Sequence, residues 1–199
     1  MVTFAAMFPT LRSKLYFWWL TREKEGLVFV AMLAAPVGLL AAIVWFAYSD
    51  GMENNARQRV AREEVERKRD AELQCLAENV YYEARGEPMS GQYAVAEVTL
   101  NRVRSPYYPD TICEVVHQSH WDPARKRRTA AFSWTALDID GTPRGRAWRQ
   151  AKKAASAVYN NTHTPVVPEA LFYHATYVDP YWAKTRKHVA TIGNHAFYR

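Results

Sequence analysis

Residues 26–48 read GLVFVAMLAAPVGLLAAIVWFAY, a run of 23 positions without a charged side chain. A helix of this length rises about 34 Å, enough to cross a bilayer core of roughly 30 Å. Pro36 and Gly38 in its middle are tolerated in a membrane span but disfavoured inside a soluble helix. A buried helix of a soluble protein is the alternative. The length of the uncharged run favours one transmembrane helix.

The orientation of this helix depends on its flanks. Residues 1–25 form a short tail with several basic side chains, but Arg57, Arg59 and Arg62 follow on the other side, so the charge bias is small. The apolar run is long for a removed signal peptide and no small-residue cleavage site follows it. We therefore predict a cytoplasmic tail over 1–25 and a signal anchor over 26–48, with the rest of the chain exported.

Residues 49–72 read SDGMENNARQRVAREEVERKRDAE and mix both charge signs. Val60 and Val65 are too isolated to form a heptad seam, so a coiled coil is not supported. Opposite charges at helical spacing, such as Glu63 and Arg67, favour a solvated helix. We expect a charged helical spacer, with disorder as the alternative.

Residues 73–199 have the length of a single domain. Apolar residues recur at helical spacing in four segments, and Gly and Pro separate the first two. These segments are 72–84, 91–103, 110–118 and 144–160. Residues 187–199 instead place β-branched residues around a Gly-Asn pair, which favours a small hairpin. The predicted domain is mainly α with a minor β element.

Cysteine and histidine bear on redox state and metal binding. Cys75 and Cys113 both fall in predicted helices. In a reducing compartment they would be buried apolar residues, whereas an exported domain favours a disulfide between them. Because we predict export, we expect the disulfide. His117 and His120 lie three apart and would share a helical face, but the glutamate of an HExxH motif is missing. We expect neither a metal nor another cofactor.

The stretch VYYEARGE at 80–87 contains two glutamates at the end of a predicted helix. Glu83 follows two tyrosines, whose rings would desolvate its carboxyl and raise its pKa toward the ~6–7 that suits a general acid. Glu87 precedes a proline and suits a helix start. Glu78 and Glu97 fall inside helices, where solvated faces are the simplest expectation. Local chemistry ranks Glu83 first without settling the choice.

A larger set of motifs resembles the SleB-type cell wall hydrolases, a family named after the spore cortex-lytic enzyme. The motifs are, in order, CLAENVYYEARGEPMSGQYAVAEVTLNRVRSPYYPDTICEVVHQ, FSW at 132–134, LFYHATYVDPYWA and IGNHAFYR. The resemblance covers nearly all of residues 73–199 and none of the preceding helix or spacer. Many relatives carry cysteines near FS, where this chain reads RTAAFSWTALDIDG, so a second disulfide is absent here.

The resemblance implies a lysozyme-like α+β domain that cleaves peptidoglycan glycan strands between N-acetylmuramic acid and N-acetylglucosamine. The family's catalytic acid is the first glutamate of EARGE, here Glu83. A lytic transglycosylase needs one such group, which protonates the glycosidic oxygen and then helps the muramic C6 hydroxyl attack C1, giving a 1,6-anhydro end. This differs from the two-carboxylate scheme of most glycosidases.

Further roles follow from the same resemblance. The residues expected to bind substrate are Tyr82, Phe132, Ser133, Trp134, Tyr173, His174 and Tyr177. Glu87 and Asn101 are expected to support the site.

The formal net charge of +6 suits an anionic partner such as nucleic acid, a lipid surface or cell wall. The resemblance selects peptidoglycan glycan strands and no nucleic acid. The apolar run at 26–48, which the resemblance does not cover, predicts a single-pass protein of the inner membrane with its C-terminal domain in the periplasm or wall space. Two alternatives stay open, an N-acetylmuramoyl-L-alanine amidase and a non-catalytic wall-binding module. The sequence does not distinguish a bacterial remodelling enzyme from a phage endolysin.

Overall fold

A computed structural model of the chain describes residues 8–123, 126–137, 139, 141 and 143–199. The chain divides into two compact units, Met1–Arg62 and Glu63–Arg199. Helix α1, Phe8–Ala84, provides the helical part of the first unit and the first helix of the second. The predicted boundaries after residues 25, 48 and 72 are therefore changes of composition within one helix. Residues 1–7 of the predicted tail lie outside the described residues.

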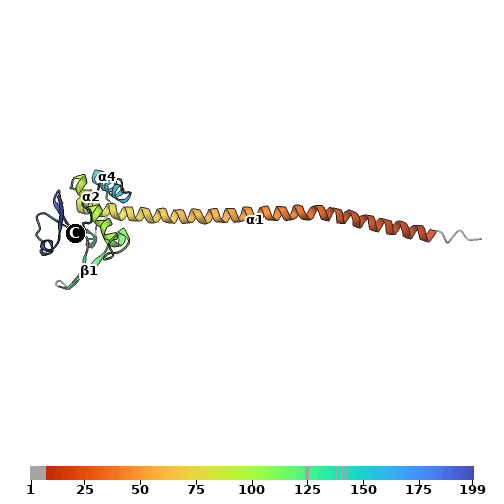
Figure 1. Cartoon of the computed structure of the whole chain (residues 1–199), viewed down its shortest axis with the longest axis horizontal. Helices are drawn as coiled ribbons and strands as arrows, with labels where there is room; N and C mark the ends of the chain where they lie inside the picture. The colour runs from red at the N-terminus through yellow and green to blue at the C-terminus, as the bar shows by residue number, and fades with distance from the viewer. Residues whose placement is uncertain (1–7, 124–125, 138, 140, 142) are drawn as a thin grey trace, which may run out of the picture. The chain divides into compact units, whose positions relative to one another are not determined.

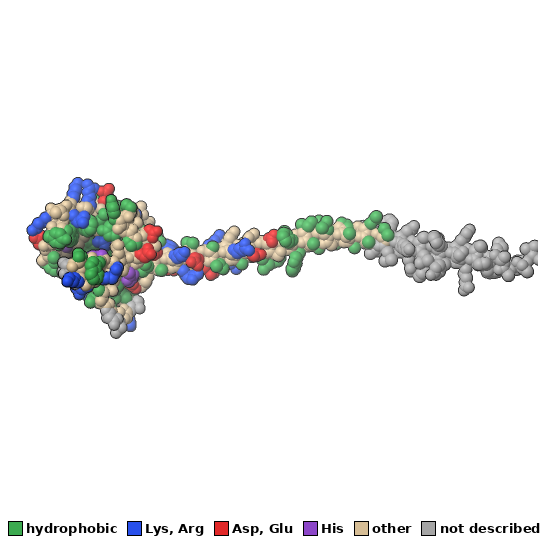
Figure 2. All heavy atoms as spheres, turned by 90° about the horizontal axis from the view of Figure 1, so that it is seen from below, with side chains coloured by type: hydrophobic (Ala, Val, Ile, Leu, Met, Phe, Trp, Pro, Cys, Tyr) green, Lys and Arg blue, Asp and Glu red, His purple; other side chains and the backbone are tan. Residues whose placement is uncertain are grey.

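The apolar stretch of α1 exposes its side chains. From Ala34 to Ala71 every residue is exposed, including Val44, Trp45 and Phe46 at 66–74%. Within the described residues this is the one helix long and apolar enough to cross a membrane by length and composition, and its 18-residue apolar window has a mean hydropathy of 1.3. Figure 2 shows apolar side chains giving way to mixed basic and acidic ones along the helix.

The charged stretch that follows is helical. Arg57 contacts Glu53, and Lys68 lies 3.6 Å from the Glu64 carboxylate, both at i, i+4 spacing. Exposed pairs of this kind contribute only about 0.3–0.5 kcal/mol each. Helix formation over 49–72 agrees with the predicted spacer rather than with disorder.

The second unit combines helices with two small antiparallel sheets (Figure 1). After α1 come α2 Met89–Val103, α3 Ile112–Val116, β1 Ser119–Asp122, β2 Arg127–Ala130, η2 Ser133–Ala136, α4 Gly145–Tyr159, β3 Phe172–Ala175, η3 Tyr181–Thr185, β4 His188–Ile192 and β5 His195–Tyr198. The prediction of a mainly α domain with a small hairpin is confirmed.

The core lies among the end of α1, α2 and α4. Leu76 and Val80 on α1 are fully buried and belong to one cluster with Trp148, Ala151 and Ala155 of α4. The α4 residues recur at helical spacing, which places one apolar face inward. Each large aliphatic side chain buried in this way contributes about 1.5–3 kcal/mol.

The three-stranded sheet has the order β3-β5-β4, with both pairings antiparallel. Tyr173 pairs with Phe197, and His174 pairs with Ala196. Phe197 is fully buried and clusters with Val98 of α2. Because side chains alternate along a strand, Tyr173 shares the helix-facing side with Phe197, whereas His174 lies on the other face.

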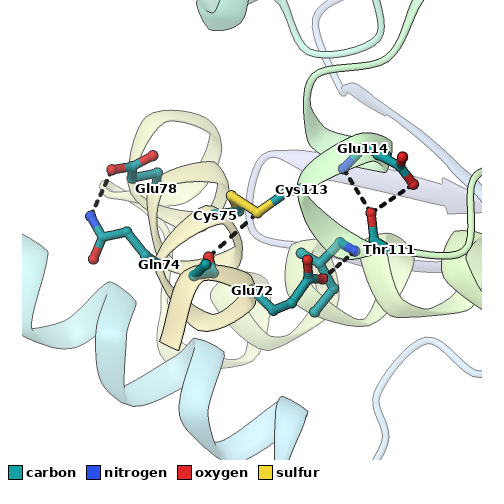
Figure 3. Close-up of a disulfide and its surroundings, with 9 residues drawn as sticks. Glu72, Gln74, Cys75, Glu78, Thr111, Cys113 and Glu114 are labelled. Atoms are coloured by element: carbon teal, nitrogen blue, oxygen red, sulfur yellow. Dashed lines mark hydrogen bonds between the residues drawn. A yellow bond between two sulfur atoms is a disulfide. The ribbon is translucent and has the colours of Figure 1, made fainter. Parts of the chain in front are cut away.

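Cys75 and Cys113 form a disulfide that joins α1 to α3 across 38 positions of sequence (Figure 3). Helix α3 has five residues, too few to be stable alone. Its start is held by side chains: the Glu72 carboxylate accepts a hydrogen bond from its first backbone N–H, and the Thr111 hydroxyl accepts from the Glu114 N–H at 3.3 Å. The disulfide and these caps position α3 together.

The turn of the β4–β5 hairpin is held by Glu87, from the loop between α1 and α2. Glu87 Oε2 accepts from the Asn194 N–H at 2.9 Å, and Oε1 accepts from the Asn194 side-chain amide at 3.0 Å. Gly193 has a φ of +58°, and a Cβ there would lie 1.8 Å from Glu87 Oε2. Glycine is thus required by the turn conformation and by the carboxylate beside it.

Three strands were not expected from the sequence. Buried and exposed residues do not alternate along β1, so its sequence lacks the two-residue period that predicts a strand.

His117 caps the end of α3 and His120 lies on β1. The expectation that these two histidines share a helical face is therefore wrong.

Replacing Gly193 with alanine is expected to destabilise the second unit. The left-handed backbone alone costs about 1–2 kcal/mol for a residue with a Cβ, and displacement of Glu87 adds to this. Urea unfolding of the full chain, followed by tryptophan fluorescence, measures the loss. Gly86→Ala is the matched control, because a Cβ at Gly86 meets nothing within 4 Å. Equal stability of the two variants would contradict this account of the turn.

Candidate active site

Glu83 lies in the last turn of α1 with its carboxyl half-buried. Glu83 Oε2 accepts a hydrogen bond from the Tyr173 hydroxyl at 2.9 Å. Burial raises the pKa of Glu83 above its ordinary value, and the Tyr173 hydrogen bond and the Arg102 charge oppose that rise. The net direction is upward, so burial is the dominant effect and the carboxyl holds its proton at higher pH than an exposed glutamate does.

Tyr173 donates to this carboxyl from strand β3. Its ring meets His195 edge-on at 5.4 Å between centroids and lies 5.6 Å from the Phe197 ring. Burial, and then the negative charge of Glu83, raise the pKa of Tyr173 well above its ordinary value. The phenol therefore stays protonated and serves as a fixed hydrogen-bond donor to Glu83.

Arg102 of α2 supplies the positive charge near Glu83. Its Nε donates to the Leu171 carbonyl at 2.9 Å, and its guanidinium carbon lies 5.1 Å from the centroid of the Phe132 ring. Arg102 is only 9% exposed, so its charge is weakly screened by solvent. It favours the ionised form of Glu83, which is the form left after the carboxyl gives up a proton.

This arrangement suits a group that gives a proton and later recovers it. Before transfer, burial favours the protonated form of the Glu83 carboxyl, because it raises the pKa. After transfer, the Tyr173 hydroxyl and the Arg102 charge stabilise the carboxylate. A single carboxyl with these partners has the properties of a general acid that returns as a base.

Tyr82 and Trp134 form an aromatic pair beside this end of α1. Their rings stack at 4.5 Å with an angle of 23° between planes, and Ser133 next to them is exposed. Both rings line a cleft of about 410 Å³. Stacked aromatic faces at a cleft suit contact with sugar rings.

The other predicted groove residues lie in different places. Phe132 is 2% exposed and packs in the core, so it does not wall a groove as expected; its ring faces Arg102 instead. Tyr173 contacts the Glu83 carboxyl directly. Tyr177, beyond the end of β3, is 88% exposed.

His174 belongs to an aromatic cluster on the outer face of the sheet. It stacks on Tyr198 at 5.3 Å, meets Trp182 edge-on at 5.5 Å, and places Nε2 3.1 Å from the Tyr198 hydroxyl oxygen. Strand alternation puts it on the opposite face from Tyr173. The structure therefore does not bring His174 together with Glu83.

Of the two expected supporting residues, Glu87 holds the hairpin turn and Asn101 holds a loop. The Asn101 amide donates to the Ala170 carbonyl at 3.1 Å, close to the start of β3. His195 lies between Glu87 and Tyr173, and burial lowers its pKa. Sequence reasoning missed His195, because nothing in its local pattern indicates contact with either residue.

Glu97 was expected on a solvated face, and this is wrong. Its side chain is 7% exposed and accepts from the Val166 N–H at 2.9 Å, the Val167 N–H at 2.8 Å and His163 Nε2 at 2.7 Å. Glu97 therefore organises the loop before β3 instead of meeting solvent.

Within the described residues, no group of three or more His, Cys, Asp or Glu side chains is placed to hold a metal ion. His117 borders the aromatic cleft, and His120 is exposed on β1.

Comparisons with known proteins identify the family of this domain. Residues 86–198 match the family described as Cell Wall Hydrolase. The spore cortex-lytic enzyme of Oceanobacillus iheyensis is 33% identical over 129 residues, which are 63% of this chain and 41% of the relative. That of Bacillus subtilis is 33% identical over 128 residues, 63% of this chain and 37% of the relative. The chain thus spans about two fifths of the length of these curated relatives.

Two solved structures have a similar fold. The catalytic domain of the germination-specific lytic transglycosylase SleB from Bacillus anthracis has a TM-score of 0.52 and 34% identity, covering 64% of this chain and 93% of that domain. The catalytic domain of the Bacillus cereus SleB protein has a TM-score of 0.50 and 35% identity, covering 64% and 89%.

The family match begins at residue 86, so Glu83 lies just before it, and the role of Glu83 depends on its own geometry. The match nevertheless covers more than half of the chain and includes α2, the sheet and the residues that surround Glu83. The chain therefore belongs to the cell wall hydrolase family of SleB type.

Proposed function

We propose that this protein is a lytic transglycosylase that cleaves the β-1,4 bond between N-acetylmuramic acid and N-acetylglucosamine in peptidoglycan. The observation that carries the proposal is the half-buried Glu83 carboxyl, with a raised pKa and a hydrogen bond from Tyr173. The other carboxylate of the motif, Glu87, is occupied by Asn194. A reaction that needs one carboxyl fits this site better than one that needs two.

Glu83 would serve in both halves of the reaction. Its protonated carboxyl donates a proton to the glycosidic oxygen as the bond to the muramic C1 breaks, and the glucosamine end leaves with a new hydroxyl. The C6 hydroxyl of the same muramic residue then bonds to C1, and its proton passes to the Glu83 carboxylate. The products are a 1,6-anhydro-muramic end and a recharged acid, with no water consumed.

The surrounding residues support this cycle. The Tyr173 hydroxyl and the Arg102 charge stabilise the carboxylate while the C6 hydroxyl attacks. The rings of Tyr82 and Trp134, which stack on each other, also line a cleft and can contact a sugar ring there. The named relatives include a lytic transglycosylase domain from Bacillus anthracis, which supports the same chemistry.

Replacing Glu83 with glutamine removes the acid and keeps the side-chain shape. Release of fragments from purified sacculi is expected to fall at least about 100-fold, as is typical for loss of a general acid. Mass analysis of the wild-type products should show 1,6-anhydro-muramic ends. Glu66→Gln, an exposed change on α1, is the matched control and should keep full activity.

The same product analysis separates the alternatives. Free L-alanine amino termini would support an amidase, and no release by the wild type would support a non-catalytic wall-binding module. A fully active Glu83→Gln variant would overturn the assignment of the acid.

Replacing Tyr173 with phenylalanine is expected to shift the pH profile. The Tyr173 hydrogen bond lowers the pKa of Glu83, so its loss raises that pKa. A general acid works protonated, and the rate therefore falls as pH rises through the pKa of Glu83. In Tyr173→Phe this fall in kcat/KM should occur at higher pH than in the wild type. No shift, or a shift to lower pH, would contradict the proposed pair.

We propose that the chain is a single-pass protein of the inner membrane, with residues 26–48 as the span and the cell wall hydrolase domain outside the cytoplasm. The exposed apolar side chains of α1 and the disulfide support this topology. A reporter enzyme that is active only outside the cytoplasm, fused after Arg199, should be active. The same reporter placed within residues 1–25 should be inactive. An inactive fusion after Arg199 would contradict both the proposed topology and the proposal that the domain acts on the cell wall.

A further inference from the structure

The cleft of about 410 Å³ contains a carboxylate that the proposed reaction does not use. Its wall includes Tyr82 and Trp134, together with Glu78, His117 and Thr135. Glu78 and Tyr82 are four residues apart on α1, so they share one face of the helix. Glu83 is the next residue after Tyr82 on α1, although its own side chain is not among those that line the cleft.

The aromatic wall of this cleft is held rigidly. The Trp134 indole N–H donates to Asn79 Oδ1 at 3.0 Å, and Asn79, fully buried, donates in turn to the Thr99 hydroxyl at 3.1 Å. The Trp134 ring stacks on Tyr82 and meets His117 edge-on at 6.0 Å. A binding surface whose side chains are already fixed costs little conformational entropy when a ligand binds.

Glu78 contributes a carboxylate to the described part of the cleft wall. Glu78 Oε1 accepts a hydrogen bond from the Gln74 amide at 2.6 Å (Figure 3), which orients the carboxylate and uses one of its two oxygens. Among the described residues that line the cleft, Glu78 is the only acidic one, and there is no lysine or arginine.

A carboxylate beside aromatic faces favours a particular ligand chemistry. A primary ammonium group forms a charge-assisted hydrogen bond with the carboxylate and is attracted to an aromatic ring wherever Tyr82 or Trp134 presents its face to the cleft. An anionic group would be repelled by Glu78. A neutral hydroxyl would gain a hydrogen bond but no attraction of charge.

We propose that Glu78, Tyr82 and Trp134 form a subsite for a primary ammonium group carried by the wall polymer. This inference rests on the proposed function, because peptidoglycan is the polymer concerned. Two parts of that polymer can carry the group: a diamino acid of the stem peptide, or a glucosamine that lacks its acetyl group. The subsite would favour strands with a free amine next to the bond that is cut.

Binding can be measured without cleavage by using the full chain with Glu83→Gln as background. Co-sedimentation with purified sacculi gives an apparent Kd for this variant, for Glu83→Gln with Glu78→Gln, and for Glu83→Gln with Glu66→Gln as the matched control. Each is tested on untreated sacculi and on sacculi whose amines have been blocked by N-acetylation. Peptide-free glycan strands, untreated and N-acetylated, form the third and fourth substrates.

Loss of the Glu78 charge is expected to weaken binding to untreated sacculi about tenfold and to leave binding to N-acetylated sacculi unchanged. N-acetylation should weaken binding of the Glu83→Gln background by a similar factor. Unchanged binding to the blocked sacculi also shows that the variant is folded. An effect confined to peptide-bearing sacculi assigns the amine to the stem peptide, and an effect that persists on peptide-free glycan assigns it to glucosamine.

Two outcomes overturn the subsite. Equal weakening on untreated and N-acetylated sacculi would mean that Glu78 contacts hydroxyls or supports the fold, and no weakening on either would mean that it does not contact the polymer. Neither outcome depends on catalysis. Failure of the proposed reaction would appear separately, as full activity of Glu83→Gln on sacculi.

Discussion

Two carboxylates of one short turn fasten the C-terminal sheet to the helices, and the candidate site depends on both. Glu83 accepts from Tyr173 on β3, and Glu87 accepts from Asn194 at the β4–β5 turn. His195 packs between them, against the Tyr173 ring and near the Glu87 carboxylate. Contacts at two places on one sheet, strand β3 and the β4–β5 turn, therefore hold the Tyr173 hydroxyl next to Glu83. The two glutamates of EARGE thus hold different parts of the sheet, and the proposed reaction uses only Glu83.

Side chains of helix α2 hold the segment that leads into β3 by hydrogen bonds to its backbone. Glu97 accepts from the backbone N–H groups of Val166 and Val167, Asn101 donates to the Ala170 carbonyl, and Arg102 donates to the Leu171 carbonyl. Polar side chains on one helix thus satisfy successive backbone groups of an irregular segment that would otherwise be buried without partners. Of these three residues, only Arg102 also influences Glu83 through its charge.

The helices could be predicted from local information, because the helical spacing of apolar residues is visible within short stretches of sequence. Local chemistry ranked Glu83 first among the glutamates, and the family resemblance then selected it as the proposed acid. Residues whose roles depend on distant partners could not be predicted in this way. Glu97 looks like any surface glutamate of a helix until the loop at 166–167 folds over it. Phe132 and His174 belong to motifs that suggest a groove, yet core packing and strand alternation direct them elsewhere. Strand β3, with four residues, is too short for a clear two-residue period.

The order of the strands has a consequence for biosynthesis. Strand β5 lies in the middle of the sheet, between β3 and β4, although it is the last of the three to leave the ribosome. Before residues 195–198 have emerged, β3 has no neighbour with which to pair, and Tyr173 has neither Phe197 nor His195 beside it. A nascent chain that stops short of this strand carries Glu83 but not the surroundings that tune it. The surroundings of Tyr173, and through them those of Glu83, are thus complete only once strand β5 has been made.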